Sequence, residues 1–290
     1  MKDLVDDQIH NGPFIQACTH IWSDDVSRDQ KSGVYDYYKE ISERFNKTLV
    51  DHTNMPKEGL IYVGMCHLLE QVFGSIPRRP DDKYIFIHRT NDRPFTKEMY
   101  SCKPPSVKHI YTVDCQVNTH DVSAIPFGNA SINGEDEIVK MVAKEKVEPA
   151  KTKLFVRMNV NNDGSTQHRM RALSELPSKS FAKIITHQIP QDEFFRECKA
   201  HKFTLALAGC GADASRQWSA IQLGSIPIVT DCIEMRHFKD LPLVYCPLNM
   251  SDLTEEWLDK QSVEGKSTER MRASYWINHI NNKKKEHGIS

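Results

Sequence analysis

Residues 203–231 combine a tight glycine turn with a fixed positive charge at the start of a predicted helix. An apolar run ends at Ala208, Gly209-Cys-Gly211 follows, and Arg216 lies in the first helical turn. Small residues let the backbone approach a ligand closely, and the free amides and dipole of a helix N-terminus favour an anion. A guanidinium at this point can hold a diphosphate. The same spacing also occurs in a strand–turn–helix connection that binds nothing, and Arg216 favours the ligand site.

Helical spacing separates the side chains of this helix into two faces. We expect the face that packs on the sheet to carry Ala214, Trp218 and Ile221. The other face, which would line a cleft, carries Ser215, Ser219 and Gln222.

A second interpretation of the same segment is dinucleotide binding. Gly209-x-Gly211-x-x-Ala214 fits the glycine fingerprint of an NAD-dependent oxidoreductase, and Asp231 follows at the expected distance, at a strand end. The unit lies late in the chain, however. Few residues follow Asp231 to form a second nucleotide-binding half and a substrate domain.

The segment resembles the nucleotide-sugar-binding region of exostosin-like glycosyltransferases, glycosyltransferase family 47. The matching positions are Phe203, Leu205, Leu207, Gly209, Ser215, Arg216, Ala220, Gly224, Ile226, Pro227 and Val229. The clear similarity covers about thirty residues. Ala208 and Ser225 depart from the family pattern, and Ser219 stands where the family has an acidic residue that binds the donor's ribose.

The resemblance implies an α/β protein of the GT-B class, with two Rossmann-like domains facing across a cleft. It implies an inverting, metal-independent transfer of a sugar from a nucleotide sugar to a glycan or glycoprotein acceptor, without any other cofactor. The donor would be a UDP-sugar such as UDP-xylose, UDP-glucuronate or UDP-galactose. Arg216 and the turn at Gly209 and Gly211 would hold its phosphates. The remaining donor contacts would be Arg157, Arg169, Ser215, Ser219 and Asp231.

Inversion requires a general base that deprotonates the acceptor hydroxyl. One cluster places His20, Trp22, Asp24 and Asp25 within six residues, and Trp22 could stack on an acceptor sugar. A second cluster places His88 and Asp92 after a predicted strand, where ligand sites of α/β proteins form. We favour Asp92 or His88, followed by Asp24 and His20. His120 with Asp121 is a third possibility.

Composition limits the classes of function. The formal net charge is -1, which offers no general attraction to nucleic acid or to an anionic membrane. No apolar stretch is long enough to span a bilayer, and the eight cysteines are scattered without close metal-ligand pairs. We therefore expect a cytoplasmic enzyme of microbial or large-virus origin, without a structural metal, unless an anchor has been removed. A non-catalytic nucleotide- or carbohydrate-binding protein stays open as an alternative.

The elements that must position these residues are predicted from periodicity. In the first half we expect a helix over 34–45, a stretch from residue 60 that is mostly helical with a start that could be a strand, and strands over 84–88, 109–113 and 122–125. The second half alternates strands over 153–158, 182–186, 204–208 and 226–230 with helices over 167–176, 191–201 and 214–223. This rhythm predicts a parallel sheet covered on both faces. The expected domains are 1–150, 151–267, and a C-terminal helix within 268–290 that packs back on the first.

Overall fold

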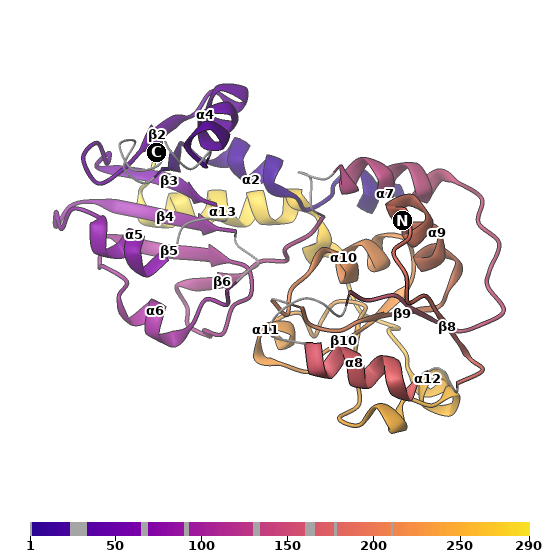
Figure 1. The fold of residues 1–290 in the computed structure, drawn as a ribbon. Coiled ribbons are helices and arrows are strands. Elements are labelled where there is room, and N and C mark those ends of the chain that lie inside the picture. The colour runs from indigo at the N-terminus through magenta and orange to yellow at the C-terminus, as the bar shows by residue number, and fades with distance from the viewer. Residues whose placement is uncertain are drawn as a thin grey trace. The chain divides into compact units, whose positions relative to one another are not determined.

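The computed structural model describes residues 2–23, 34–64, 69–89, 93–129, 134–159, 166–176, 179–209 and 211–290. Within these ranges the chain is α/β and forms two compact units, each with its own parallel sheet (Figure 1). The N-terminal unit contains Asn11–Ile125 and Ala273–Ser290, and the C-terminal unit contains Met1–His10 and Pro126–Arg272. Each unit is therefore built from two separate stretches of sequence, whose ends differ from the expected domain limits.

In the N-terminal unit the described strands lie in the order β2-β1-β3-β4-β5-β6, and all neighbouring strands are parallel. The strands are β1 His20–Trp22, β2 Thr48–Val50, β3 Glu58–Val63, β4 Lys83–His88, β5 Val107–Thr112 and β6 Val122–Ala124. The helices of this unit are α2 Asn11–Ala17, α4 Val34–Phe45, α5 Leu69–Ser75, α6 Lys97–Ser101 and α13 Ala273–His287. The central strand β4 is buried from Tyr84 to His88, as expected for a parallel strand covered on both faces.

In the C-terminal unit the described strands lie in the order β11-β10-β9-β7-β8, again all parallel. The strands are β7 Leu154–Val156, β8 Ala182–Ile184, β9 Phe203–Ala206, β10 Ile226–Val229 and β11 Val244–Tyr245. The helices are α1 Lys2–Asp6, α7 Glu135–Lys144, α8 Thr166–Glu175, α9 Gln191–Ala200, α10 Ser215–Gln222, α11 Ile233–Arg236 and α12 Glu255–Lys260, with short 3-10 turns η2 Met250–Asp252 and η3 Glu269–Met271. Counted along the chain, this is the doubly wound order 2-1-3-4-5, whose switch point lies between β7 and β9.

Side chains of β7 alternate between two hydrophobic cores of the C-terminal unit. Leu154 and Val156 join the core that contains residues of α8 and α12, whereas Phe155 joins Val139 of α7 and Phe195 of α9. Figure 1 shows these two groups of helices on opposite sides of the sheet. Helices α7, α9 and α10 thus form one layer, and their first turns lie near the carboxyl ends of the strands.

Most predicted elements occur within a few residues of their expected limits, and α4 has the expected limits. For the stretch from residue 60 the strand alternative holds at its start, because β3 continues to Val63, and the favoured helix begins only with α5 at Leu69. A strand buried on both faces is a continuous apolar run, which periodicity cannot distinguish from a buried helix. The three-residue strands β1 and β2 were not predicted.

No described helix is both long and apolar enough to cross a membrane. The described residues also contain no group of three or more His, Cys, Asp or Glu placed to hold a metal ion. Metal-independent chemistry stays a prediction.

Candidate anion site

A pocket of about 440 Å³ lies in the C-terminal unit, among residues that follow the carboxyl ends of β7, β8 and β9 and the first turn of α7. Ligand sites of doubly wound sheets form at this edge, next to the switch point. The pocket is lined by Glu135, Arg157, Gln188, Ile189, Pro190, Gln191, Phe194, Phe195, Ser215 and Arg216. Arg157, Ser215 and Arg216 are therefore brought together, as the donor-site prediction requires.

Three helices begin at this pocket. Glu135 is the first residue of α7, Gln191 of α9, and Ser215 of α10. Within the described ranges, none of the three N-cap residues forms a side-chain capping hydrogen bond. The backbone amides and dipoles of helix N-termini favour negative charge, so the pocket is suited to an anion.

Arg216 supplies a positive charge and a hydrogen-bond donor that has no described acceptor. Its Nη1 atom is buried and has no hydrogen-bond partner among the described residues. Burial, followed by the nearby charges of Arg169 and Arg157, lowers the pKa of Arg216 to about 10. The guanidinium stays protonated at neutral pH despite this shift. A buried N–H group of a charged side chain is unfavourable unless an acceptor completes it.

Besides Arg216, the pocket has a second positive charge, one negative charge and an apolar wall. Arg157 directly follows β7 and adds a second positive charge. Glu135 is the opposing charge; its carboxylate accepts a hydrogen bond of 2.8 Å from Gln191 Nε2. The rings of Phe194 and Phe155 lie 5.5 Å apart, so the apolar wall at Phe194 continues into the core. An anionic group bound at the arginines would thus adjoin an apolar surface.

Arg169 has a structural position instead of a donor-binding one. It is buried, and its guanidinium donates to the carbonyl oxygens of Ala208 (2.8 Å), Asn159 (2.8 Å) and Leu207 (3.1 Å). These bonds tie the loop after β7 to the loop after β9. Arg169 does not line the pocket, so its expected contact with the donor phosphates is not what the structure shows.

Gly209, Gly211 and Asp231, the residues of the dinucleotide interpretation, form contacts within the protein and do not face the pocket. A Cβ atom at Gly209 would lie 2.6 Å from Arg169 Nη2, so this glycine makes room for a guanidinium. The backbone N–H of Gly209 donates to the carbonyl of Gly211 over 2.8 Å. Asp231 is exposed and forms two hydrogen bonds with Arg236, of 2.7 and 3.0 Å. That ion pair lowers the pKa of Asp231. None of the three residues lines the anion pocket.

Ser219 and Trp22 lie in the cores of their units. Ser219 has 0% exposed surface, and its hydroxyl donates to Asn129 Oδ1 over 2.9 Å. Gln222, expected on the same cleft-facing side of the helix, is also buried. The cleft-facing prediction was wrong for these two because Asn129 and α7 pack against the outer face of α10. Trp22 is buried too, so its indole offers no surface to an acceptor sugar here.

The candidate bases are only partly described. Asp24 and Asp92 lie outside the described residues. His88 ends β4, is buried, and its Nδ1 lies 3.0 Å from Thr112 Oγ1. His20 begins β1, its Nδ1 lies 2.8 Å from Thr19 Oγ1, and burial lowers its pKa.

Asp121 of the third candidate pair holds Tyr100 Oη at 3.0 Å and Lys103 Nζ at 3.1 Å. These contacts, like those of the two histidines, are also compatible with structural roles.

Sequence reasoning missed seven of the ten residues that line the pocket. Glu135, Gln191 and Phe194 come from helices remote in sequence from Arg216. Pro190 before a helix was recognised as a start signal, and the acidic first turn of α7 is another. Neither signal indicates that both helix starts meet at α10.

Comparison with models of protein families finds no match, and comparison with curated proteins finds no significant match. The chemistry of this pocket therefore has to be inferred from its residues.

Proposed function

We propose that this chain is a glycosyltransferase that takes its sugar from a nucleotide sugar and binds the donor's diphosphate beside Arg216. The observation that carries the proposal is the buried Nη1 of Arg216, which has no partner among the described residues and lies where three helices begin. Phosphate oxygens would supply the missing acceptor and additional negative charge. The segment that resembles exostosin-like transferases contains this arginine, which supports the same assignment.

The walls of the pocket suit the parts of such a donor. Arg216 and Arg157 would neutralise the diphosphate as it leaves, which replaces the divalent metal that other transferases use. Ser215 offers a hydroxyl at the same helix start. The apolar wall at Ile189 and Phe194 would accommodate the flat face of a nucleobase. UDP-sugars, UDP-xylose among them, are the proposed donors.

The rest of the proposal follows from the resemblance. Two parallel-sheet units are compatible with the GT-B architecture, in which the N-terminal unit would bind a glycan or glycoprotein acceptor. Transfer would invert the anomeric centre, with Asp92 as the proposed base and His88 or Asp24 as alternatives. The enzyme would act in the cytoplasm.

Ligand-induced thermal stabilisation tests the donor site. UDP should raise the melting temperature of the full chain equally with Mn²⁺ and with EDTA, and NAD should not. Arg216→Ala should lower UDP affinity by about 10- to 100-fold, because a charged hydrogen bond to phosphate is lost. Arg171→Ala is the matched control, since Arg171 is exposed on α8 and pairs with Glu175. Equal UDP affinity in the Arg216→Ala and Arg171→Ala proteins would contradict the proposed site.

Catalysis is tested separately from binding. A transferase should slowly hydrolyse its preferred UDP-sugar without an acceptor and release UDP, whereas a non-catalytic binding protein should release none. Stabilisation by NAD instead of UDP would favour the oxidoreductase.

A further inference from the structure

Glu135 places a carboxylate in a pocket that is otherwise suited to an anion. It is half-buried at the first residue of α7, and it is the only acid among the described residues that line the pocket. Acidic residues in a first helical turn stabilise the helix dipole, but Asp136 and Glu137 already supply such charge at α7. A carboxylate that faces the pocket also repels a bound phosphate. Its position is therefore explained better by a contact with another part of the ligand.

The charges around Glu135 indicate what kind of group it can bind. Burial and the charges of Arg169 and Arg157 lower the pKa of Arg216, whereas the negative charge of Glu135 raises it. The carboxylate thus lies within electrostatic reach of Arg216, and Arg157 lines the same pocket. Because two guanidinium groups repel a cation, a neutral hydrogen-bond donor is the more favourable partner for Glu135. A hydroxyl group meets this requirement, since its hydrogen bond to a carboxylate is charge-assisted.

Gln191, the first residue of α9, holds the Glu135 carboxylate at the pocket wall. Its Nε2 donates to Glu135 Oε1 over 2.8 Å. An ionised carboxylate only accepts hydrogen bonds, so the Gln191 amide directs its NH₂ group at Glu135. A carboxylate has two oxygens and about four lone-pair sites, so it can accept from ligand hydroxyls in addition to its contacts within the protein.

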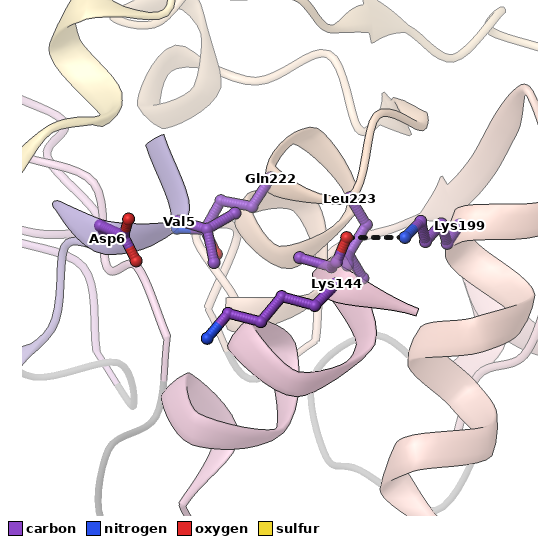
Figure 2. Close-up of a pocket in the computed structure, with 7 residues that line it drawn as sticks. Val5, Asp6, Lys144, Lys199, Gln222 and Leu223 are labelled. Carbon is purple, nitrogen blue, oxygen red and sulfur yellow. Dashed lines mark hydrogen bonds between the residues drawn. The ribbon is translucent and has the colours of Figure 1, made fainter. Parts of the chain in front are cut away.

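The helices that carry these two residues are tied together at their other ends. Lys199 Nζ of α9 donates to the carbonyl oxygen of Ala143, in the last turn of α7, over 2.8 Å, and Figure 2 shows this bond. Arg196 of α9 donates to both carboxylate oxygens of Glu145, which directly follows α7, over 2.6 and 3.0 Å. The two helices therefore form a firm support that keeps Glu135 in place before a ligand binds.

We propose that Glu135 binds the ribose of the donor, with its carboxylate accepting hydrogen bonds from the 2′- and 3′-hydroxyl groups. This inference rests on the proposed function. The ribose of a nucleotide lies between its diphosphate and its base, and Glu135 lines the same pocket as Arg216 and Phe194, the proposed partners of those two groups. Ser219, the expected ribose contact, is buried in the core and cannot serve. Glu135 would thus select a nucleotide over a simple anion, which gains from the arginines but is repelled by the carboxylate.

Calorimetric titrations of the full chain with UDP and 2′,3′-dideoxy-UDP test this role, in EDTA and in a buffer free of phosphate and sulfate. The wild type should bind UDP about tenfold or more tightly than the dideoxy compound, because the hydroxyl groups bind a charged acceptor. Glu135→Ala should reduce this preference to about threefold or less. Glu137→Ala is the matched control, because Glu137 lies in the same helical turn, is exposed and pairs with Lys140. It should keep the wild-type preference.

Inorganic pyrophosphate, which has no hydroxyl groups on carbon, tests the same variant in the opposite direction. Glu135→Ala should bind pyrophosphate as tightly as the wild type or more tightly, because a repelling negative charge is removed. Retained pyrophosphate binding also shows that the pocket of this variant is folded.

An unchanged preference for UDP over dideoxy-UDP in Glu135→Ala would overturn the role of Glu135 while leaving the diphosphate site intact. Equal loss of UDP, dideoxy-UDP and pyrophosphate binding in this variant would also overturn it, because Glu135 would then support the pocket as a whole. The proposed function fails in a different way, namely if the wild type binds neither UDP nor pyrophosphate, or if Arg216→Ala leaves UDP affinity unchanged.

Discussion

The guanidinium of Arg169 occupies the space that a side chain at residue 209 would need: a Cβ atom on Gly209 would lie 2.6 Å from Arg169 Nη2. Real Cβ atoms essentially never approach another atom so closely. The guanidinium cannot simply move aside, because it holds the carbonyl oxygens of Ala208, Asn159 and Leu207. The glycine that looks like part of a phosphate-binding turn thus serves an internal contact that connects two loops at the edge of the sheet.

Gly209→Ala should therefore lower the free energy of unfolding by about 1–3 kcal/mol, through the displaced guanidinium and its lost hydrogen bonds. The loss should be smaller when Arg169 is already alanine, because the two residues are in contact and their effects are not additive. Urea unfolding of the four proteins of this cycle measures the coupling.

The matched control is Gly74→Ala, in helix α5, where a Cβ atom would meet nothing within 4 Å. It should be neutral or stabilising by up to about 1 kcal/mol, because alanine is the better helix former. If the two substitutions had the same effect, steric exclusion at residue 209 would be the wrong explanation.

Local patterns were sufficient to predict β7, β8, β9 and β10 of the C-terminal unit, but not β11, and the position of Arg216 at a helix start. Ser215 and Arg216 lie there because a short strand, a glycine turn and a helix follow one another directly in the sequence. The burial of Ser219 could not be predicted in the same way. It depends on Asn129, 90 residues away in the chain, whose amide oxygen accepts the serine hydroxyl.

The structural role of Arg169 could not be predicted from the sequence either. The sequence predicts that this arginine lies in a helix, but not that its three guanidinium nitrogens will donate to backbone carbonyls. Glu135 and Gln191 illustrate the same limit, since only tertiary packing brings their helix starts together. The sequence therefore predicts the individual helices and strands well. It does not predict which polar groups form hydrogen bonds with one another across the fold.

Arg216→Met should distinguish the effect of Arg216 on the stability of the ligand-free protein from its effect on UDP binding. Without ligand, this variant should be as stable as wild type or more stable by about 1–2 kcal/mol, because it removes a charged group whose buried Nη1 has no described hydrogen-bond partner. It should also lose the stabilisation that UDP gives to the wild type. Thermal unfolding with and without UDP, in a buffer free of phosphate and sulfate, measures both effects. A strongly destabilised variant would show that the guanidinium has a structural role.

Lys199→Met should destabilise the C-terminal unit by about 1–3 kcal/mol. Its ammonium group donates to three carbonyl oxygens at the end of α7, and these acceptors would lose their partner at the negative end of a helix. Lys183→Met is the control, because Lys183 is exposed and pairs with Glu197 near the surface. It should change stability by no more than about 1 kcal/mol. Urea unfolding of both variants makes the comparison, and similar losses would argue against a special role for Lys199.

His109 should make the stability of the N-terminal unit depend on pH. Its Nε2 lies 2.9 Å from Ser123 Oγ, and burial, assisted by the charges of Lys283 and His279, lowers its pKa to about 3. The unfolded chain takes up a proton near pH 6.5, whereas the folded chain does not until about pH 3. The free energy of unfolding should therefore fall as the pH decreases between these values, by about 1–2 kcal/mol from pH 6.5 to 5.

His109→Gln keeps a donor for Ser123 and removes this titration, so its stability should fall less over the same interval. Urea unfolding at pH 8, 6.5 and 5 measures the difference, with the pH 8 values giving the constant cost of the substitution. His120→Gln, which removes an exposed histidine, provides the background effect. Other buried histidines such as His201, whose pKa is also lowered by burial, contribute equally to the proteins compared and cancel in the subtraction. Parallel pH profiles for wild type and His109→Gln would show that His109 takes up its proton at similar pH in both states, contrary to its burial in the sheet.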